Sequence, residues 1–146
     1  MRITLWDAEG NRVACSEEAV VSKSEGNAAV LDVSNVHLWD GIKDPYLYVL
    51  KAELIHGGMV IDEISCNCGI RHFSFSPKDG FYLNGRPYPL HGVSRHQDYR
   101  GIGNAITKEE HERDMALIRE VGANTIRLAH YQHDQYFYDL CDKYGM

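Results

Sequence analysis

Two short polar clusters hold most of the side chains in this sequence that could bind or transform a small molecule. They are residues 94–98, Ser-Arg-His-Gln-Asp, and residues 127–133, Arg-Leu-Ala-His-Tyr-Gln-His. Each follows a short apolar run that we predict to be a β-strand. In folds built from parallel strands, substrates meet the protein at the carboxyl ends of the strands, because the loops converge there. Two polar clusters at equivalent positions therefore favour a shared binding site over two unrelated buried histidines.

A metal site is one alternative use of His96, His130 and His133, together with His91. The spacing does not support it, because no His-x-x-x-His pair lies within one predicted helix, and the Cys66-Asn67-Cys68 stretch belongs to a different predicted domain. A zinc site would need ligands held in a compact framework. We therefore expect no metal or other cofactor in this segment.

Nucleophilic and acid–base catalysis are further alternatives. A serine triad would place its serine in a sharp Gly-x-Ser-x-Gly turn, and Ser94 has no such setting. Glycoside hydrolysis needs two carboxylates across the scissile bond, whereas Asp98 is the only acid in either cluster. The glutamates between the clusters fall on a predicted helix, where a solvated face explains them. The two clusters thus supply substrate contacts without a catalytic pair of acids.

The elements that must position these clusters begin after residues 76–80, Ser-Pro-Lys-Asp-Gly, a polar turn cluster at which the sequence pattern changes. We take this cluster as the boundary between two domains, 1–75 and 76–146. Directly after it, an Asn84-Gly85 pair between two short apolar runs predicts a hairpin with a type I′ turn. A predicted strand at residues 90–94 then leads into the first polar cluster.

The segment between the two clusters carries the signals of one helix. Thr107 and Glu110 have the spacing of a capping box, which predicts a helix over residues 108–121, and Gly122 is placed to end it. We expect the buried side of this helix to consist of Met115, Ile118 and Val121.

A strand over residues 123–129 and a second helix over residues 134–144, closed by Gly145, complete the pattern. The apolar stripe predicted for this helix is Phe137, Leu140, Cys141 and Tyr144. The order strand, helix, strand, helix predicts a parallel βαβ unit, since parallel strands need a long crossover. Two parallel strands cannot complete a sheet, so we expect the sequence to be a piece of a longer protein.

Residues 1–75 instead show short apolar runs separated by turns, which predicts an antiparallel sandwich. In the longest run the even positions from Tyr46 to Leu54 share one face, opposite Lys51 and Glu53. A loop at residues 24–27 precedes the third run. The predicted strands are residues 3–6, 12–15, 28–33, 46–56, 59–66 and 69–75.

Composition excludes several classes of protein. The chain has 146 residues, of which 44% are hydrophobic and 25% charged, and its formal net charge is −6. An acidic chain is a poor partner for nucleic acid, and no apolar run approaches the roughly 20 residues of a membrane span. The 4 cysteines are too few and too irregular for a disulfide scaffold, so we expect free, buried thiols. The amino-terminal residues carry no secretory leader, which predicts a cytoplasmic protein.

Two stretches, Gly-Val-Ser-Arg-His-Gln-Asp at 92–98 and Thr-Ile-Arg-Leu-Ala-His-Tyr at 125–131, closely resemble the β-galactosidases of glycoside hydrolase family 2. The resemblance extends through residues 81–87 and 138–145 and upstream through Trp39 and residues 45–48, and so covers essentially the whole chain. It implies a partial immunoglobulin-like β-sandwich over residues 1–75, followed by the first two β/α units of a (β/α)8 TIM barrel.

The resemblance also implies roles for individual residues. His96 and His130 correspond to two family histidines that line the sugar subsite, and an imidazole can donate a hydrogen bond to a sugar hydroxyl. Arg127 corresponds to the arginine that holds the nucleophilic glutamate. Asp98 lies in the same motif, and we expect it to bind substrate or to orient a neighbouring residue. His133 and Gln132 rank below these four.

The family's acid/base and nucleophilic glutamates, and the carboxylates through which it binds magnesium, correspond to positions beyond Met146. We therefore expect the parent protein to be a retaining β-galactosidase and the 146-residue chain alone to be inactive.

Two alternatives stay open at this point: the same scaffold acting as a β-glucuronidase or β-mannosidase, and a non-catalytic module that binds carbohydrate or protein. The expected partner is a β-galactoside, with no nucleic acid and no membrane. A homo-oligomeric parent is compatible with the resemblance, and an unpaired strand edge predicts self-association of the piece.

Overall fold

The computed structural model describes residues 1–17 and 28–146. They form two compact units, one of Met1–His37 with Tyr46–Ile70 and one of Leu38–Pro45 with Arg71–Met146. The last passage of the chain from the first unit to the second lies between Ile70 and Arg71. The predicted domain limit between residues 75 and 76 stays a prediction.

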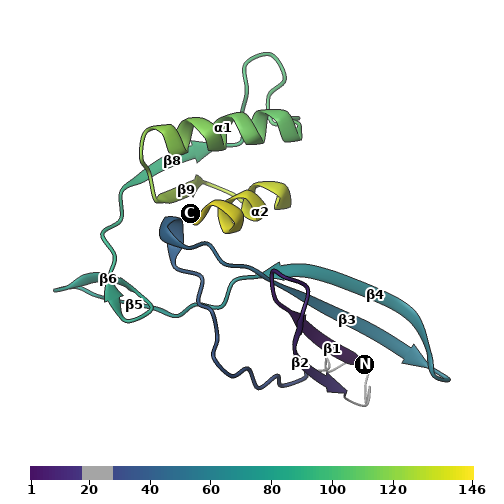
Figure 1. Ribbon diagram of the computed structural model, residues 1–146. Coiled ribbons are helices and arrows are strands. Elements are labelled where there is room, and N and C mark those ends of the chain that lie inside the picture. Colours follow the sequence, from purple (N-terminus) through teal and green to yellow (C-terminus); the bar gives the residue numbers. More distant parts are fainter. Residues whose placement is uncertain (18–27) are drawn as a thin grey trace. The chain divides into compact units, whose positions relative to one another are not determined.

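The first unit contains one antiparallel sheet with the strand order β2-β1-β3-β4 (Figure 1). Its strands are β1 (Arg2–Trp6), β2 (Arg12–Glu17), β3 (Tyr48–His56) and β4 (Met59–Cys68). The prediction of a strand at residues 28–33 is wrong, because this run is irregular and pairs with no strand among the described residues. An apolar run forms a strand only when its backbone pairs with a neighbour, and this run pairs with neither of the edge strands, β2 and β4. The predicted loop at 24–27 lies outside the described residues.

Strand β3 shows little of the predicted alternation in burial, since residues 50–53 are all half-buried. Leu54 is 39% exposed although we expected it on the buried face, and the register with β4 shifts just after it, between Leu54 and Ile55. On the opposite face the two charged side chains are half-buried rather than fully solvated. Each has an ion-pair partner: Lys51 lies 2.9 Å from Glu63, and Glu53 lies 2.7 Å from Arg2.

The second unit begins with a small sheet of β5 (Phe73–Ser76), β6 (Gly80–Leu83) and β7 (Arg86–Pro87). The type I′ turn is confirmed, since Asn84 and Gly85 have φ of 51° and 75°. The polar cluster at residues 76–80 is the turn of the β5–β6 hairpin. The strand expected at residues 69–75 is shorter and shifted, because only its last part reaches a pairing partner in β6.

A parallel strand pair with two helices follows: β8 (Gly92–His96), α1 (Lys108–Glu120), β9 (Thr125–Ala129) and α2 (Gln135–Tyr144). The capping box of Thr107 and Glu110 is present. Gly122 and Gly145 follow the helices with φ of 77° and 79°, a left-handed backbone that glycine adopts without strain. The sequence signals thus placed both helices within one or two residues of their ends.

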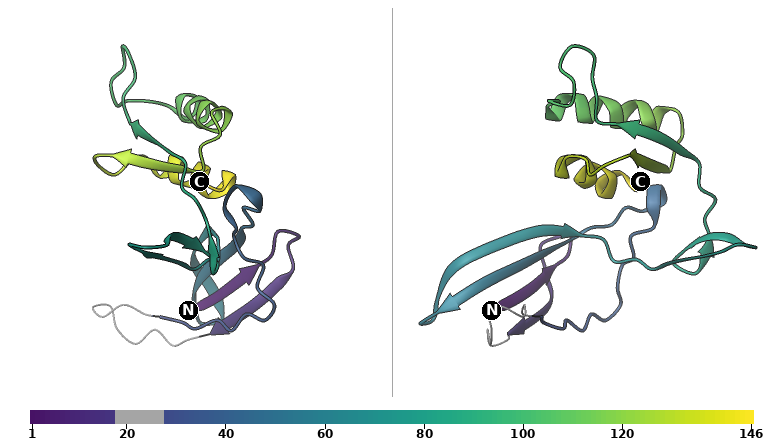
Figure 2. Two further views of the ribbon diagram at one scale, coloured as in Figure 1. Left: turned by 90° about the vertical axis from the view of Figure 1, so that its left-hand side faces the viewer. Right: turned by 180° about the vertical axis from the view of Figure 1, so that it is seen from behind.

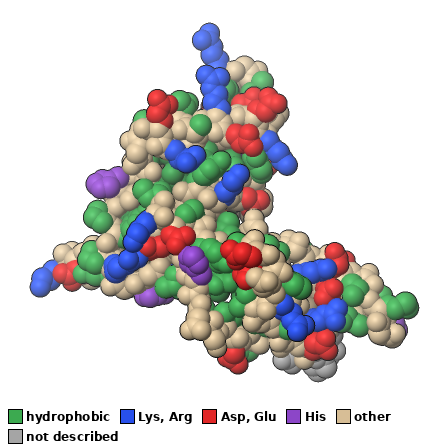
Figure 3. Space-filling view, viewed as in Figure 1, with side chains coloured by type: hydrophobic (Ala, Val, Ile, Leu, Met, Phe, Trp, Pro, Cys, Tyr) green, Lys and Arg blue, Asp and Glu red, His purple; other side chains and the backbone are tan. Residues whose placement is uncertain are grey.

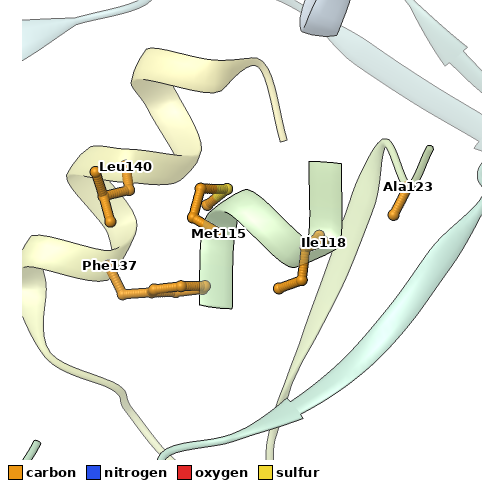
Figure 4. Close-up of a cluster of buried hydrophobic side chains, with 5 residues drawn as sticks. All are labelled: Met115, Ile118, Ala123, Phe137 and Leu140. Carbon is orange, nitrogen blue, oxygen red and sulfur yellow. The ribbon is translucent and has the colours of Figure 1, made fainter. Parts of the chain in front are cut away.

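Both helices pack on one side of β8 and β9 (Figure 2). The core between them consists of Met115, Ile118, Ala123, Phe137 and Leu140 (Figure 4). Val121, which we expected in this core, is 72% exposed. It caps the carboxyl end of α1, where the chain turns back toward β9, and the buried stripe starts one turn earlier than predicted, at His111.

The cysteines, the surface charge and the length of the helices complete the description. Cysteines 15, 66, 68 and 141 are free, as expected, but Cys15 and Cys66 are exposed rather than buried. Burial raises the pKa of the Cys141 thiol to about 12. The visible face in Figure 3 mixes acidic and basic side chains without a large area of one sign. None of the described helices is long and apolar enough to cross a membrane.

Candidate functional site

Alternation along β8 and β9 sorts the polar residues onto two faces. The strands pair in parallel with Ser94 opposite Arg127 and Arg95 opposite Leu128. Ser94, His96 and Arg127 are exposed, whereas Val93, Ile126 and Leu128 pack against the helical core. Successive side chains of a strand point to opposite faces, so Arg95 lies on the helix side and its neighbour His96 on the open side.

The open face brings together three of the four predicted site residues. The rings of His96 and His130 meet edge to face, with their centroids 5.3 Å apart and an interplanar angle of 81°. Arg127 Nη2 lies 3.0 Å from His130 Nδ1. The peptide bond between Ala129 and His130 is cis. Residues from the ends of both parallel strands therefore form one exposed Arg–His cluster.

The hydrogen bond from Arg127 determines which nitrogen of His130 carries the proton. A guanidinium can only donate, so Nδ1 of His130 must be the acceptor. The ring proton is then on Nε2, which makes this atom a hydrogen-bond donor. Arg127 thereby prepares His130 to donate to a ligand oxygen.

Asp98 occupies a different place from these three residues. It is exposed and, with His96, lines an open groove of about 450 Å³ beside β8 and α1. Neither Arg127 nor His130 lines this groove. His96 thus belongs both to the histidine pair and to the lining of the groove, whereas Asp98 lines the groove alone.

A second Arg–His cluster, which the sequence did not reveal, lies on the helix side of the strands. Arg95 is 6% exposed, and it contacts two buried histidines, His111 (2% exposed) and His133 (7% exposed). Its Nη2 and Nη1 lie 3.1 Å and 3.0 Å from their respective Nδ1 atoms. Asp114 supplies the counter-charge, 2.8 Å from Arg95 Nε. The guanidinium also stacks over the ring of Phe137 at 3.9 Å.

Both histidines of this buried cluster are held neutral. Since Arg95 donates, each Nδ1 is an acceptor. Burial lowers the pKa of His111 and of His133, and the nearby Arg95 charge lowers both further. The neutral ring of His133 can donate from Nε2 to the carbonyl of Ala129, at 3.4 Å. His133, predicted as a minor site residue, is therefore a buried structural partner of Arg95.

The alternation of side chains along a strand could have indicated that Arg95 is buried. Val93 and Arg95 are two positions apart on the same strand, so an apolar partner on the helix side implies a buried charge next to it. His111 likewise shares its helix face with Met115, four residues on. Both signals were present, but no local feature shows that the arginine and the two histidines meet.

Gln97, directly after β8, also contacts the loop that follows β9. Its side-chain oxygen accepts a hydrogen bond of 2.7 Å from the backbone N–H of Asp134, and its carbonyl accepts one of 3.2 Å from the hydroxyl of Tyr131. The two predicted clusters are thus joined by direct hydrogen bonds.

Metal binding has no support in the residues that the structure describes, where no group of three or more His, Cys, Asp or Glu side chains could hold an ion. His91 precedes β8, at the opposite end of the strand from His96. The magnesium site implied by the resemblance stays a prediction for the parent protein, and no step proposed below uses a metal.

Comparisons with known proteins identify the family of the chain. Residues 1–71 match the model of glycosyl hydrolases family 2, and residues 77–146 match that of the glycosyl hydrolases family 2 TIM barrel domain. A β-glucuronidase of Bacteroides fragilis is 43% identical over 94% of this chain, which covers 20% of that protein. The β-galactosidase BoGH2A of Bacteroides ovatus is 37% identical over 97% of this chain and is covered over 17% of its length.

Solved structures of similar proteins point to the same family. Bacteroides uniformis β-glucuronidase 2, covalently bound to cyclophellitol-6-carboxylate aziridine, superposes with a TM-score of 0.86 at 34% identity over 99% of this chain and 18% of that one. The chain thus spans about a fifth of the length of the relatives it matches. Two adjoining family matches and this likeness lead to one conclusion: the chain belongs to glycoside hydrolase family 2.

Proposed function

We propose that this chain forms part of the sugar-binding site of a retaining β-glycosidase that acts on a β-galactoside or a β-glucuronide. The observation that carries the proposal is the cluster of His96, His130 and Arg127 at the carboxyl ends of two parallel strands. In this proposal β8 to α2 are the first two units of a (β/α)8 barrel, whose substrates bind at that end of the strands. The four-stranded sheet β2-β1-β3-β4 would belong to an immunoglobulin-like sandwich.

The two histidines would bind hydroxyl groups of the sugar. With its proton on Nε2, His130 can donate to one hydroxyl, and the exposed ring of His96 stands beside it, 5.3 Å away between centroids. Such bonds accelerate hydrolysis if they strengthen as the sugar ring becomes oxocarbenium-like, because catalysis requires tighter binding of the transition state than of the substrate.

Arg127 would stabilise a carboxylate nucleophile supplied by another part of the parent protein. A guanidinium next to a carboxylate favours its ionised form and holds it by charge-assisted hydrogen bonds. The covalent aziridine complex of the Bacteroides uniformis relative supports a mechanism with a glycosyl–enzyme intermediate. Asp98 is proposed as a further substrate contact on the groove side of His96.

The relatives differ in the sugar that their names indicate. Those named above include two β-glucuronidases and one β-galactosidase. The decisive measurement is kcat/KM of the complete protein on p-nitrophenyl β-D-galactoside and β-D-glucuronide, with labelling by cyclophellitol-6-carboxylate aziridine. Preference for the glucuronide together with labelling would assign a β-glucuronidase, and preference for the galactoside without labelling would assign a β-galactosidase.

Variants of the histidines test the site itself. We expect His96→Ala and His130→Ala each to lower kcat/KM about 10- to 100-fold, the loss of one or two hydrogen bonds that strengthen in the transition state. His91→Ala, also exposed but before the amino end of β8, is the matched control and should stay near wild type. Hydrolysis of neither substrate by the complete protein, or equal effects of all three variants, would overturn the proposal.

A further inference from the structure

The two residues that flank His96 in sequence hold the same loop. Arg95 binds His133, and Gln97 binds the backbone of Asp134. Both partners lie just after His130, the residue whose ring meets His96. The loop is therefore attached to the end of β8 from both sides of His96, by hydrogen bonds of 3.0 Å and 2.7 Å.

Arg95 is suited to hold this loop rigidly. Its planar guanidinium has five donors in a fixed arrangement, and at 6% exposure it contacts Asp114, His111 and His133 at once. The three partners come from α1 and from the loop after β9. Rotation of the guanidinium would break all three interactions together, so the side chain has little freedom.

Geometry at the open face depends on this attachment. His130 lies three residues before His133, and His133 also contacts the carbonyl of Ala129 at 3.4 Å. A shift of His133 would therefore move both ends of the short segment that contains His130. Displacement of a substrate-binding group by about 1 Å can lower a rate about 100-fold.

We propose that Arg95 is a positioning residue for the sugar-binding histidines: through its bond to His133 it holds His130 against His96, although it touches no substrate. This inference rests on the proposed function and extends it to the buried cluster. His111 binds the same guanidinium from α1 and does not belong to the loop, so its bond serves stability alone.

The pair of histidines provides a matched experiment in the complete protein. Glutamine at either position keeps a polar side chain of similar size but cannot place an acceptor where Nδ1 stands, whereas asparagine can place its Oδ1 there. We expect His133→Gln to lower kcat about 10- to 100-fold, and His133→Asn to restore at least a third of the wild-type kcat. His111→Gln should lower kcat less than about 3-fold while it lowers the melting temperature as much as His133→Gln.

Each rate is normalised to the folded fraction measured by circular dichroism, so that partial unfolding is not mistaken for lost positioning. If His133→Gln does not fold, Gln97→Ala tests the other attachment of the loop and should lower kcat without a change in the pH optimum.

The outcomes separate the two proposals. Equal kcat for His133→Gln and His111→Gln, or no rescue by asparagine, would overturn the positioning role while hydrolysis by the wild type leaves the proposed function in place. A wild-type protein that hydrolyses neither glycoside would overturn both. A large loss of kcat in His133→Gln alone, with similar falls in melting temperature in both glutamine variants, would establish the inference.

Discussion

The two faces of the β8–β9 pair carry the same residue types with opposite properties. On the open face Arg127 donates to His130, and on the helix side Arg95 donates to His111 and His133. The open cluster is exposed, whereas the buried one has Asp114 as a counter-ion and a phenylalanine ring beneath it. Exposure leaves the first cluster able to exchange water for a ligand, and burial commits the second to its protein partners.

The difference shows why an arginine and two histidines are not by themselves a binding site. A buried cation costs free energy unless its donors are satisfied, and Arg95 has partners for both terminal nitrogens and for Nε. At 6% exposure, this guanidinium is held by protein partners rather than offered to a ligand. Arg127 has only one bond recorded within the described residues, to His130, and retains donors for a carboxylate.

The largest expected effect is on activity, from the open face. Arg127→Ala in the complete protein should lower kcat/KM about 100- to 1000-fold, because a charge-assisted donor to the nucleophile would be lost. Arg113→Ala, an exposed arginine on α1, serves as the control and should change kcat/KM less than about 2-fold. A wild-type rate for Arg127→Ala would contradict the role of the open face in activity.

The next effect is on stability, from the helix side. Arg95→Met should lower the free energy of unfolding by about 3 kcal/mol, because the Asp114 carboxylate and both histidine acceptors would lose their partner. Arg127→Met should cost less than about 0.5 kcal/mol, since water replaces its contacts. Urea-induced unfolding measures both values, and equal losses would contradict the distinction between the faces.

A pH titration should also distinguish the clusters. The pKa of His111 and of His133 is lowered in the folded protein, first by burial, so the unfolded chain binds protons at higher pH than the folded one. Their stabilising contribution is complete above the ordinary histidine pKa of about 6.5 and falls as the pH drops below it, by at most about 1.4 kcal/mol per pH unit for each.

Unfolding at several pH values between about 5 and 7.5 checks this slope. The charged and titratable groups near the two histidines include Arg95, Glu110, Asp114, Asp134, His96, Tyr131 and Tyr136. Replacing both buried histidines by glutamine should flatten the profile, and replacing His96 and His130 should not. An unchanged slope in the buried double variant would show that other groups cause the pH dependence.

The smallest expected effect is the coupling between the two open histidines. Their edge-to-face contact should give a coupling free energy of about 0.5 kcal/mol in a double-mutant cycle on stability, the low end for aromatic pairs. Pairing His96→Ala with His91→Ala should give no coupling. Additivity for the first pair would mean that the ring contact positions the site without stabilising it.

Sequence reasoning succeeded where one short segment contains the whole physical cause. The Asn84-Gly85 turn, the Thr107–Glu110 capping box and the terminal glycine of α2 each depend on backbone conformations that neighbouring residues decide. The meeting of the two histidines was predicted for a related reason: residues at the carboxyl ends of two parallel strands lie at one edge of the sheet, and His96, the last residue of β8, meets His130, which follows β9.

The predictions failed where distant segments decide the outcome. The apolar run at residues 28–33 found no partner strand, and Val121 continues the helical pattern but lies where α1 ends. Leu54 continues the alternating pattern of β3 but is 39% exposed. In each case the local pattern was present, and pairing or packing with another segment decided whether it was used.

The sequence by itself determined the family, the order of strands and helices in the second unit and the placement of His96 and His130 near the ends of two parallel strands, because these depend on motifs and on local periodicity. Only the tertiary structure decided that Arg95 is buried between His111 and His133 while Arg127, in the same pair of strands, is exposed. The physical reason is that burial belongs to a face of the sheet, and the helices α1 and α2 cover only one of the two faces.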